Sequence, residues 1–210
     1  MKLKAGSDIF KYESAYWTDT ETLNPESTTA DASDDIDAKL PAFNSKSFQK
    51  LKVCYKTLTN CYEYDLGSTT TSARALFGSG FQRSNNLGGG TKTATEAKRA
   101  YTDLFLEPTD AQYNYFWNGG SGSACGMQLP GINTQCPDNN KARIGYCVNL
   151  PGQGCQDQDS NDADSPVGIG LKTQNYPNNV NAPYGEYFIS GQGSAGIQAR
   201  QHQAWLFAVS

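Results

Sequence analysis

The sequence predicts a single β-rich domain of the α+β class, with a few short helices, long loops and disulfides. Three observations lead to this prediction. The 210 residues contain no linker-like stretch that would divide them, so residues 1–210 are expected to form one domain. The six cysteines form an even set. Short apolar runs alternate with Gly, Asn, Asp and Pro along most of the chain, which is typical of strands joined by turns.

The amino-terminal third contains one loop and one hairpin signal. Residues 19–37 are acidic and rich in Thr and Ser, so we expect a surface loop within residues 1–38. Residues 47–64 then alternate apolar and polar side chains on both sides of Thr59-Asn60, which predicts a β-hairpin. Cys54 and Cys61 are placed to link its two arms.

The remaining elements are short. Residues 72–77 predict a brief helix that ends at Gly78-Ser79-Gly80, and residues 94–105 have the helical spacing of apolar side chains behind a Thr N-cap. Later short apolar pieces, separated by turn residues, are residues 113–117, 143–148 and 167–171, and residues 203–209 are interpreted as a buried closing strand.

The charge of the chain and the length of its apolar runs argue against nucleic-acid binding and against a membrane span. The net charge is -4 and no cluster of Lys and Arg stands out, so nucleic acid is not an expected partner. No apolar run approaches the roughly 20 residues that cross a bilayer, so no membrane span is expected. Only 18% of residues are charged, and this polar, weakly charged composition is commoner outside cells.

The cysteines predict disulfides and therefore an extracellular, secreted protein. The six are Cys54, Cys61, Cys125, Cys136, Cys147 and Cys155. The competing interpretation is a metal site, but the chain has no Cys-x-x-Cys pair and its single His202 is distant. Connectivity stays open, with local bridges Cys54 to Cys61 and Cys147 to Cys155 expected. Residues 1–7 lack an apolar signal core, so either a signal was removed or the chain is a piece of a larger protein.

An acidic stretch indicates a calcium site. Four carboxylates and an amide fall within residues 157–164, and the expected ligands are Asp157, Asp159, Asn161 and Asp164. A hard cation with oxygen ligands relieves their mutual repulsion, and Ca²⁺ accepts irregular coordination by loops. The spacing is not that of an EF-hand, because Asp162 replaces its Gly and Gly168 its Glu. The alternative is a solvated acidic loop.

A second polar stretch, residues 133–140, is interpreted as a loop that supplies the oxygens of Asn133 and Asp138 to the same ion. Its alternative is a series of Asx turns. Aromatic side chains beside Gly and Asn, namely Trp117, Tyr184 and Tyr187, are expected to stack on the apolar faces of sugar rings.

The sequence contains few residues that are arranged for catalysis. There is no Gly-x-Ser-x-Gly elbow, and His202 stands close to the closing strand, where a surface or core-edge role is the simpler interpretation. A glycan-active enzyme would need two facing carboxylates in a cleft. We therefore do not expect an enzyme.

Several motifs resemble known extracellular proteins. Residues 125–136 (CGMQLPGINTQC), 145–147 (GYC) and 151–157 (PGQGCQD) resemble the carboxy-terminal part of intelectins, which are calcium-dependent lectins on a fibrinogen-related fold. Residues 39–53, 141–145 and 164–170 are similar to fibrinogen-related and intelectin-related proteins of corals and sea anemones. The matches are spread between Leu40 and Gly170.

The resemblance implies a fibrinogen/intelectin-like fold, and it places Asn133 and Asp157 where intelectins have calcium ligands. Asn149 lies near their ligand glutamate, and Cys136 replaces their ligand histidine. The implied function is calcium-dependent binding of glycans or glycoproteins in cell adhesion or extracellular matrix. The alternative is a structural subunit of a matrix or filament, in which the chain's partner is itself.

Overall fold

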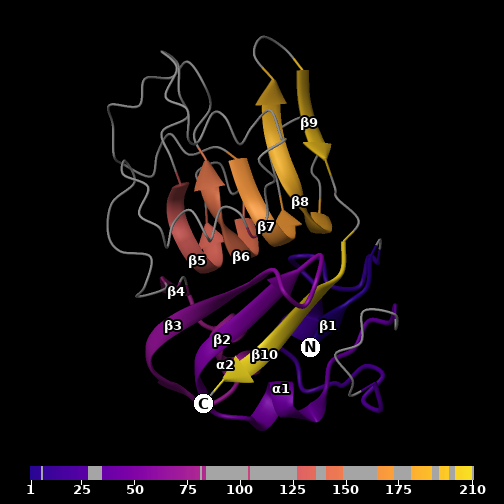
Figure 1. Cartoon of the computed structure of the whole chain (residues 1–210), viewed down its shortest axis with the longest axis vertical. Helices are drawn as coiled ribbons and strands as arrows, with labels where there is room; N and C mark the ends of the chain where they lie inside the picture. Colours follow the sequence, from indigo (N-terminus) through magenta and orange to yellow (C-terminus); the bar gives the residue numbers. More distant parts are fainter. Residues whose placement is uncertain are drawn as a thin grey trace.

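The protein has two antiparallel β-sheets and three short helical segments in the part of the chain that its computed structural model describes (Figure 1). The described residues are 1–5, 7–27, 35–80, 82–83, 104, 127–135, 141–148, 165–172, 181–190, 194–198 and 202–209. The prediction of a β-rich chain with few short helices is therefore confirmed. No helix among these residues has the length and apolar character needed to cross a membrane.

The four-stranded sheet joins the two ends of the chain. Its order is β1-β10-β2-β3, with β1 at Lys2–Leu3, β2 at Phe48–Tyr55, β3 at Cys61–Thr70 and β10 at Ala204–Val209. The closing strand β10 lies between β1 and β2, and its first three residues are buried, as the apolar sequence predicts. This pairing encloses the strand on both edges.

The six-stranded sheet is an antiparallel meander in which each strand pairs with the next along the chain. Its strands are β4 (Gln82–Arg83), β5 (Met127–Gln135), β6 (Lys141–Val148), β7 (Ser165–Lys172), β8 (Asn181–Ser190) and β9 (Ser194–Gln198). Two of the short apolar pieces, residues 143–148 and 167–171, lie within β6 and β7. The loop expected from residue 133 is wrong at its start, because Asn133 and Thr134 belong to β5, where their polar groups are buried and hydrogen-bonded.

The predicted hairpin at 47–64 is confirmed, and its disulfide is present. Cys54 and Cys61 face each other in register across β2 and β3, and they are bonded with a Cα–Cα distance of 4.0 Å. The turn between the strands contains Lys56 in the left-handed region at φ 68°. The strand β3 continues to Thr70, beyond the predicted end of the hairpin.

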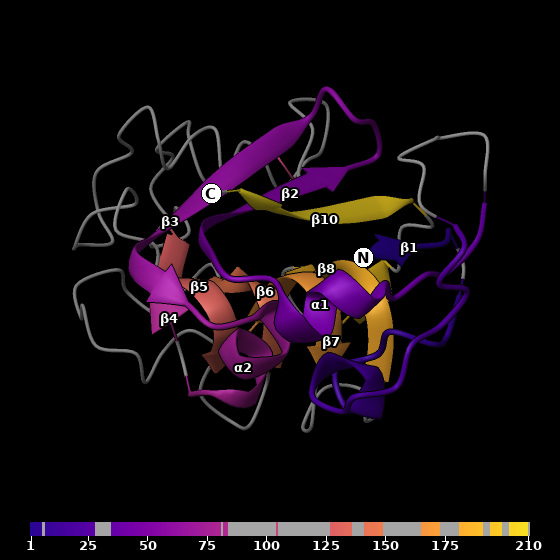
Figure 2. The ribbon, with the colours of Figure 1, turned by 90° about the horizontal axis from the view of Figure 1, so that it is seen from below.

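The helical segments are η1 at Ala15–Trp17, α1 at Pro41–Ser45 and α2 at Ala73–Gly78. The prediction of a short helix from residue 72 is confirmed: the Ser72 hydroxyl oxygen accepts a hydrogen bond from the Ala75 amide at 3.0 Å. Figure 2 shows α1 and α2 on the same side of the four-stranded sheet as β5 to β8. The helix expected at 94–105 lies outside the described residues, except for Leu104, which is helical and buried.

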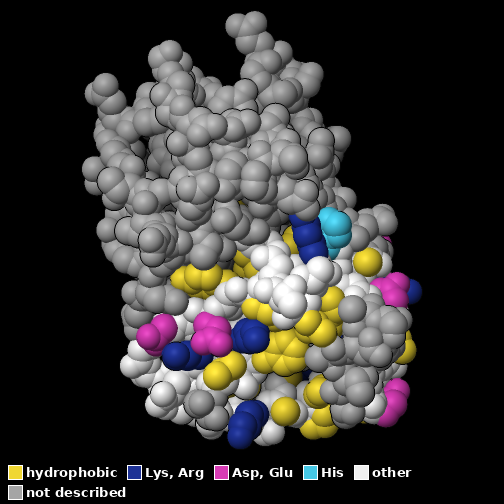
Figure 3. All heavy atoms as spheres, in the orientation of Figure 1, with side chains coloured by type: hydrophobic (Ala, Val, Ile, Leu, Met, Phe, Trp, Pro, Cys, Tyr) yellow, Lys and Arg dark blue, Asp and Glu magenta, His cyan; other side chains and the backbone are white. Residues whose placement is uncertain are grey.

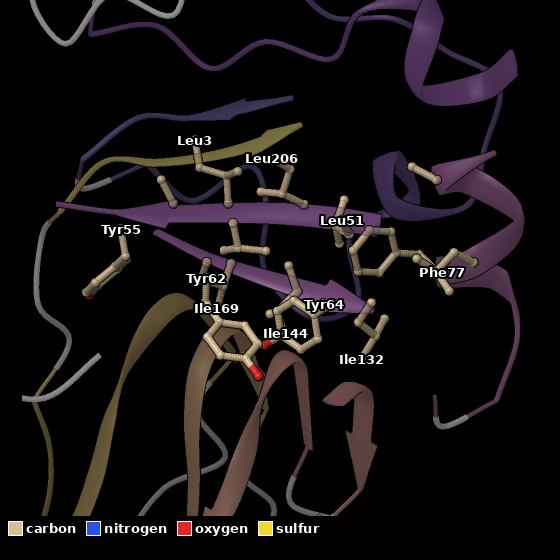
Figure 4. Packing of buried hydrophobic residues seen from close by; sticks show 14 of the residues in the cluster. Leu3, Leu51, Tyr55, Tyr62, Tyr64, Phe77, Ile132, Ile144, Ile169 and Leu206 are labelled. Carbon is tan, nitrogen blue, oxygen red and sulfur yellow. The ribbon is translucent and has the colours of Figure 1, made fainter. Parts of the chain in front are cut away.

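The core lies between the two sheets. Tyr64 and Leu51 of the four-stranded sheet face Ile144 and Ile169 of the six-stranded sheet, and all four are at most 1% exposed (Figure 4). Burial of each aliphatic side chain of this size contributes about 2 kcal/mol. Packing of these side chains thus attaches the six-stranded sheet to the four-stranded sheet.

Most described residues of the surface loop predicted at 19–37 are exposed or half-buried, and buried residues fix the loop near its two ends. Trp17 is fully buried, and its ring centroid lies 4.7 Å from that of Phe77 on α2. Asp37 is only 6% exposed, and Leu23 pairs with Lys39 through backbone hydrogen bonds. These contacts join the segment to residues distant in sequence, which its local composition does not reveal.

A row of glycines crosses the six-stranded sheet. Gly131, Gly145, Gly168 and Gly185 are paired in register across β5, β6, β7 and β8. A Cβ at position 145 would overlap the backbone carbonyl of Val167, and a Cβ at 168 would overlap the backbone carbonyl of Ile144. The close approach of these strands therefore requires glycine at both positions.

Candidate functional site

The two ends of the six-stranded sheet carry different connecting segments. Because β5 to β8 form an antiparallel meander, residues 136–140 and 173–180 connect strands at the end marked by Lys141, and residues 149–164 and 191–193 connect them at the end marked by Val148. We call these the Lys141 end and the Val148 end. In Figure 1 the arrowhead of β6 marks the Val148 end, which points away from the four-stranded sheet.

The two residues that flank the acidic segment are paired with each other in the sheet. Residues 149–164 leave the sheet at Val148 and return at Ser165, and these two residues are paired across β6 and β7. Cys147, next to this pair, is fully buried and disulfide-bonded, with a partner outside the described residues. Both ends of the stretch that contains the acidic residues are therefore held together.

Most expected calcium ligands lie in connecting segments outside the described residues. These are Asp138, Asn149, Asp157, Asp159, Asn161 and Asp164. The same holds for Trp117 and for Cys125, Cys136 and Cys155. Among the described residues, no group of three or more His, Cys, Asp or Glu side chains is arranged to hold a metal ion.

Asn133 is the expected ligand that the structure describes, and its side chain is engaged in structural hydrogen bonds. It is 7% exposed and adopts a left-handed φ of 52° within β5. Its amide nitrogen donates toward carbonyl oxygens at the end of α2, at 3.1 Å to Phe77 in the last turn and 2.8 Å to Ser79, which follows the helix. The side chain thus satisfies carbonyl groups that the end of a helix leaves without partners.

The side-chain oxygen of Asn133 contacts a cationic side chain. Its Oδ1 accepts a hydrogen bond from Nη1 of Arg143 at 2.9 Å. Burial lowers the pKa of Arg143 from its ordinary value, while Tyr12 partly opposes this effect. Because arginine keeps its charge in proteins, Oδ1 already has a positive partner, which disfavours a calcium ion at the same oxygen.

Arg143 also attaches the amino-terminal segment to the six-stranded sheet. Its Nε donates to the Tyr12 carbonyl at 2.8 Å, and its guanidinium carbon lies 4.4 Å from the centroid of the Tyr12 ring. Lys141 lies 5.9 Å from the same ring, and Lys172 pairs with Glu13. Arg143, Lys141 and Lys172 therefore each already have a partner within the protein.

The two predicted calcium-binding stretches start from opposite ends of the sheet. The strand between them, β6, has eight residues, so its ends are about 23 Å apart at the usual rise of a strand. Residues 136–140, which include Asp138, are a five-residue connection at the Lys141 end. A shared site would require the 149–164 segment to return along the full length of β6.

The two expected stacking tyrosines occupy β8. Tyr184 is paired with Ile169 and Tyr187 with Ile197.

The burial of Lys39 had no clear signal in the sequence, whereas the half-buried position of His202 agrees with the prediction. Lys39 is fully buried, with its Nζ 2.6 Å from Oδ1 of Asp19 and 5.3 Å from the Phe43 ring centroid. His202, expected at the surface or core edge, is half-buried and its ring meets Tyr55 edge-on at 5.6 Å between centroids. The residues around Lys39 in sequence gave no indication of its ion pair, because its partner Asp19 is 20 residues away along the chain.

Comparisons of the chain with protein-family models, with curated proteins and with solved structures each find no match.

Proposed function

We propose that this chain is a non-catalytic, secreted recognition module of fibrinogen/intelectin-like fold that binds carbohydrate with the help of Ca²⁺ in cell adhesion or extracellular matrix. The disulfide of the β2–β3 hairpin and the bonded state of Cys147 support an oxidising environment. The resemblance to intelectins in residues 125–157 supplies the ligand class.

The observation that carries the proposal is the pairing of the residues that flank the acidic segment. Pairing of Val148 with Ser165 brings together the two strand ends that residues 149–164 connect in the sequence. Four carboxylates in this segment repel one another, and at a spacing of 4 Å each pair costs about 1 kcal/mol even in bulk water. A calcium ion bound by these oxygens removes the repulsion.

The proposed ligands are therefore the oxygens of Asp157, Asp159, Asn161 and Asp164 at the Val148 end. Asn133 is left out because its Oδ1 contacts Arg143. Asp138 is left out because its connection starts from the Lys141 end. This set is narrower than the one that the sequence suggests.

Calcium titration calorimetry on EDTA-treated protein tests the ion. We expect saturable binding with a dissociation constant of about 10⁻⁴–10⁻³ M, the range of extracellular modules. Asp157→Asn is expected to weaken binding at least about tenfold, since it removes a charged ligand. The matched control is Asp8→Asn, which neutralises an aspartate that is 81% exposed and remote in sequence. Equal isotherms for the two variants would exclude the site.

A glycan array probed in calcium and in EDTA tests the ligand separately. We expect binding that EDTA abolishes and that Asp157→Asn reduces. Calcium binding without glycan binding would leave an ion-stabilised module and remove the lectin function.

A second candidate is a self-assembling structural subunit. It is favoured by the position of β3, a ten-residue strand at one edge of the four-stranded sheet. Edge strands offer unpaired backbone groups to another chain. Sedimentation of the purified protein into large species, with or without calcium, would support this role over the lectin.

A further inference from the structure

A pocket of about 320 Å³ opens between α1 and the four-stranded sheet. Its floor consists of Phe43 from α1, Phe48 and Leu51 from β2, and Leu206 from β10, each no more than 6% exposed. In Figure 2, α1 lies directly beneath β10 and β2. The pocket is therefore a recess that reaches into the hydrophobic core.

The mouth of the pocket is open to solvent. Ala42 of α1, Lys46 at the end of that helix and Ala208 of β10 all line the pocket and are exposed. Figure 3 shows hydrophobic side chains gathered over β10, beside a row of acidic and basic side chains over β2 and β3. A small molecule can reach the recess without opening the fold.

The charged side chains among the described residues of the pocket lining are two lysines, Lys2 and Lys46, and none of these described residues is Asp or Glu. Lys2 donates to the Ser27 hydroxyl at 3.5 Å. Lys46 forms no ion pair within the described part of the chain, so its ammonium group is available at the mouth.

We propose that this pocket binds a single-chain amphiphile with an anionic head, namely a fatty carboxylate of about ten carbons, whose alkyl chain enters the recess. An engineered cavity of about 150 Å³ binds benzene. This pocket has about twice that volume, which fits a medium-length alkyl chain but not a long one. The carboxylate then lies at the mouth, where Lys46 provides the opposite charge.

The proposal does not depend on the calcium site. The pocket belongs to the four-stranded sheet and α1, whereas the acidic segment leaves the six-stranded sheet at Val148. Loss of calcium binding in Asp157→Asn should therefore leave the affinity for the amphiphile unchanged, and the two ideas fail separately.

Titration calorimetry with decanoate, below its micelle concentration, tests the pocket, with decanol as the uncharged probe. We expect saturable binding of one decanoate with a dissociation constant between about 0.01 and 1 mM, from the usual affinity per heavy atom of small ligands. Lys46→Gln should weaken decanoate binding by up to about fivefold and leave decanol unchanged, as for a solvent-exposed ion pair.

Ala42→Leu tests the location. The added side chain extends from an exposed position of α1 into the pocket mouth, so it should weaken binding of both probes at least about tenfold. The matched control is Ser45→Leu, on the same helix but outside the pocket lining. Equal affinities of Ala42→Leu and the unchanged protein, or no saturable decanoate binding at all, would overturn the proposal.

Discussion

Arg143 of β6 donates from Nη1 to Oδ1 of Asn133 on the neighbouring strand β5, at 2.9 Å. The same nitrogen lies 3.0 Å from the carbonyl oxygen of Phe77, so one guanidinium joins two strands to the end of α2. Asn133 completes this arrangement with its own amide group. A residue that the sequence suggests as a calcium ligand is thereby a structural connection between the sheet and the helix.

Replacement of Asn133 by Ala should reduce the free energy of unfolding by about 2–4 kcal/mol, because it removes the buried hydrogen bonds from the Asn133 amide to the carbonyls at the end of α2 and from Arg143 to Oδ1. Ala also disfavours the left-handed φ of 52° at this position. Urea unfolding measures the loss, with the exposed Gln135→Ala on the same strand as the control. Calcium affinity should not change, and a variant that stays folded but loses calcium binding would return Asn133 to the ligand set.

The glycine row gives a second prediction. Gly145→Ala should lower the free energy of unfolding by more than about 3 kcal/mol, since the new methyl group would overlap the Val167 carbonyl and the strands must separate. Gly78→Ala has no atom within 4 Å of its Cβ and should change stability by less than about 1 kcal/mol. Thermal unfolding of both variants makes the comparison. Equal effects would show that β6 and β7 approach less closely than described.

The hairpin disulfide gives a third prediction. Removing it in Cys54→Ala/Cys61→Ala should reduce the free energy of unfolding by about 2–3 kcal/mol, because the closed loop of a bridge with sequence separation 7 no longer restricts the unfolded chain. The measurement is guanidinium unfolding under oxidising conditions, which keeps the other disulfides intact. No loss of stability would mean that the backbone pairing of β2 with β3 already supplies this restriction.

Asp37 predicts a pH dependence of stability. Its Oδ1 accepts a hydrogen bond from the Lys4 amide at 2.8 Å, but burial raises the pKa of the carboxyl above its ordinary value. The folded protein therefore binds the Asp37 proton more tightly than the unfolded chain does, and this contribution to stability is lost as the pH rises through the raised pKa.

Asp37→Asn keeps the acceptor without the charge. We expect the variant to be at least as stable as the unchanged protein at pH 7, with the difference shrinking as the pH falls below about 4, where the aspartate is protonated in both states. Urea unfolding across this pH range measures the difference. A variant that is clearly less stable at pH 7, with the gap closing on acidification, would show that the ionised carboxylate stabilises the fold.

Local patterns in the sequence predicted several elements correctly. Alternating side chains around Thr59-Asn60 predicted the hairpin, and its two cysteines predicted the bridge. The run from residue 72 to the Gly78-Ser79-Gly80 stop predicted the short helix α2, and its first turn is stabilised locally by the Ser72 hydroxyl. Each of these signals involves residues close in sequence, which is why composition and spacing were sufficient.

The sequence by itself determined that this chain is β-rich, disulfide-bonded and closed by a buried final strand. Only the tertiary structure decided that β10 lies between β1 and β2, that Lys39 is buried against Asp19, and that the oxygen of Asn133 faces a guanidinium. The physical reason is distance along the chain. Strand pairing between the two ends, and the burial of a charge or an amide, depend on which remote groups meet in space, and local spacing does not specify them.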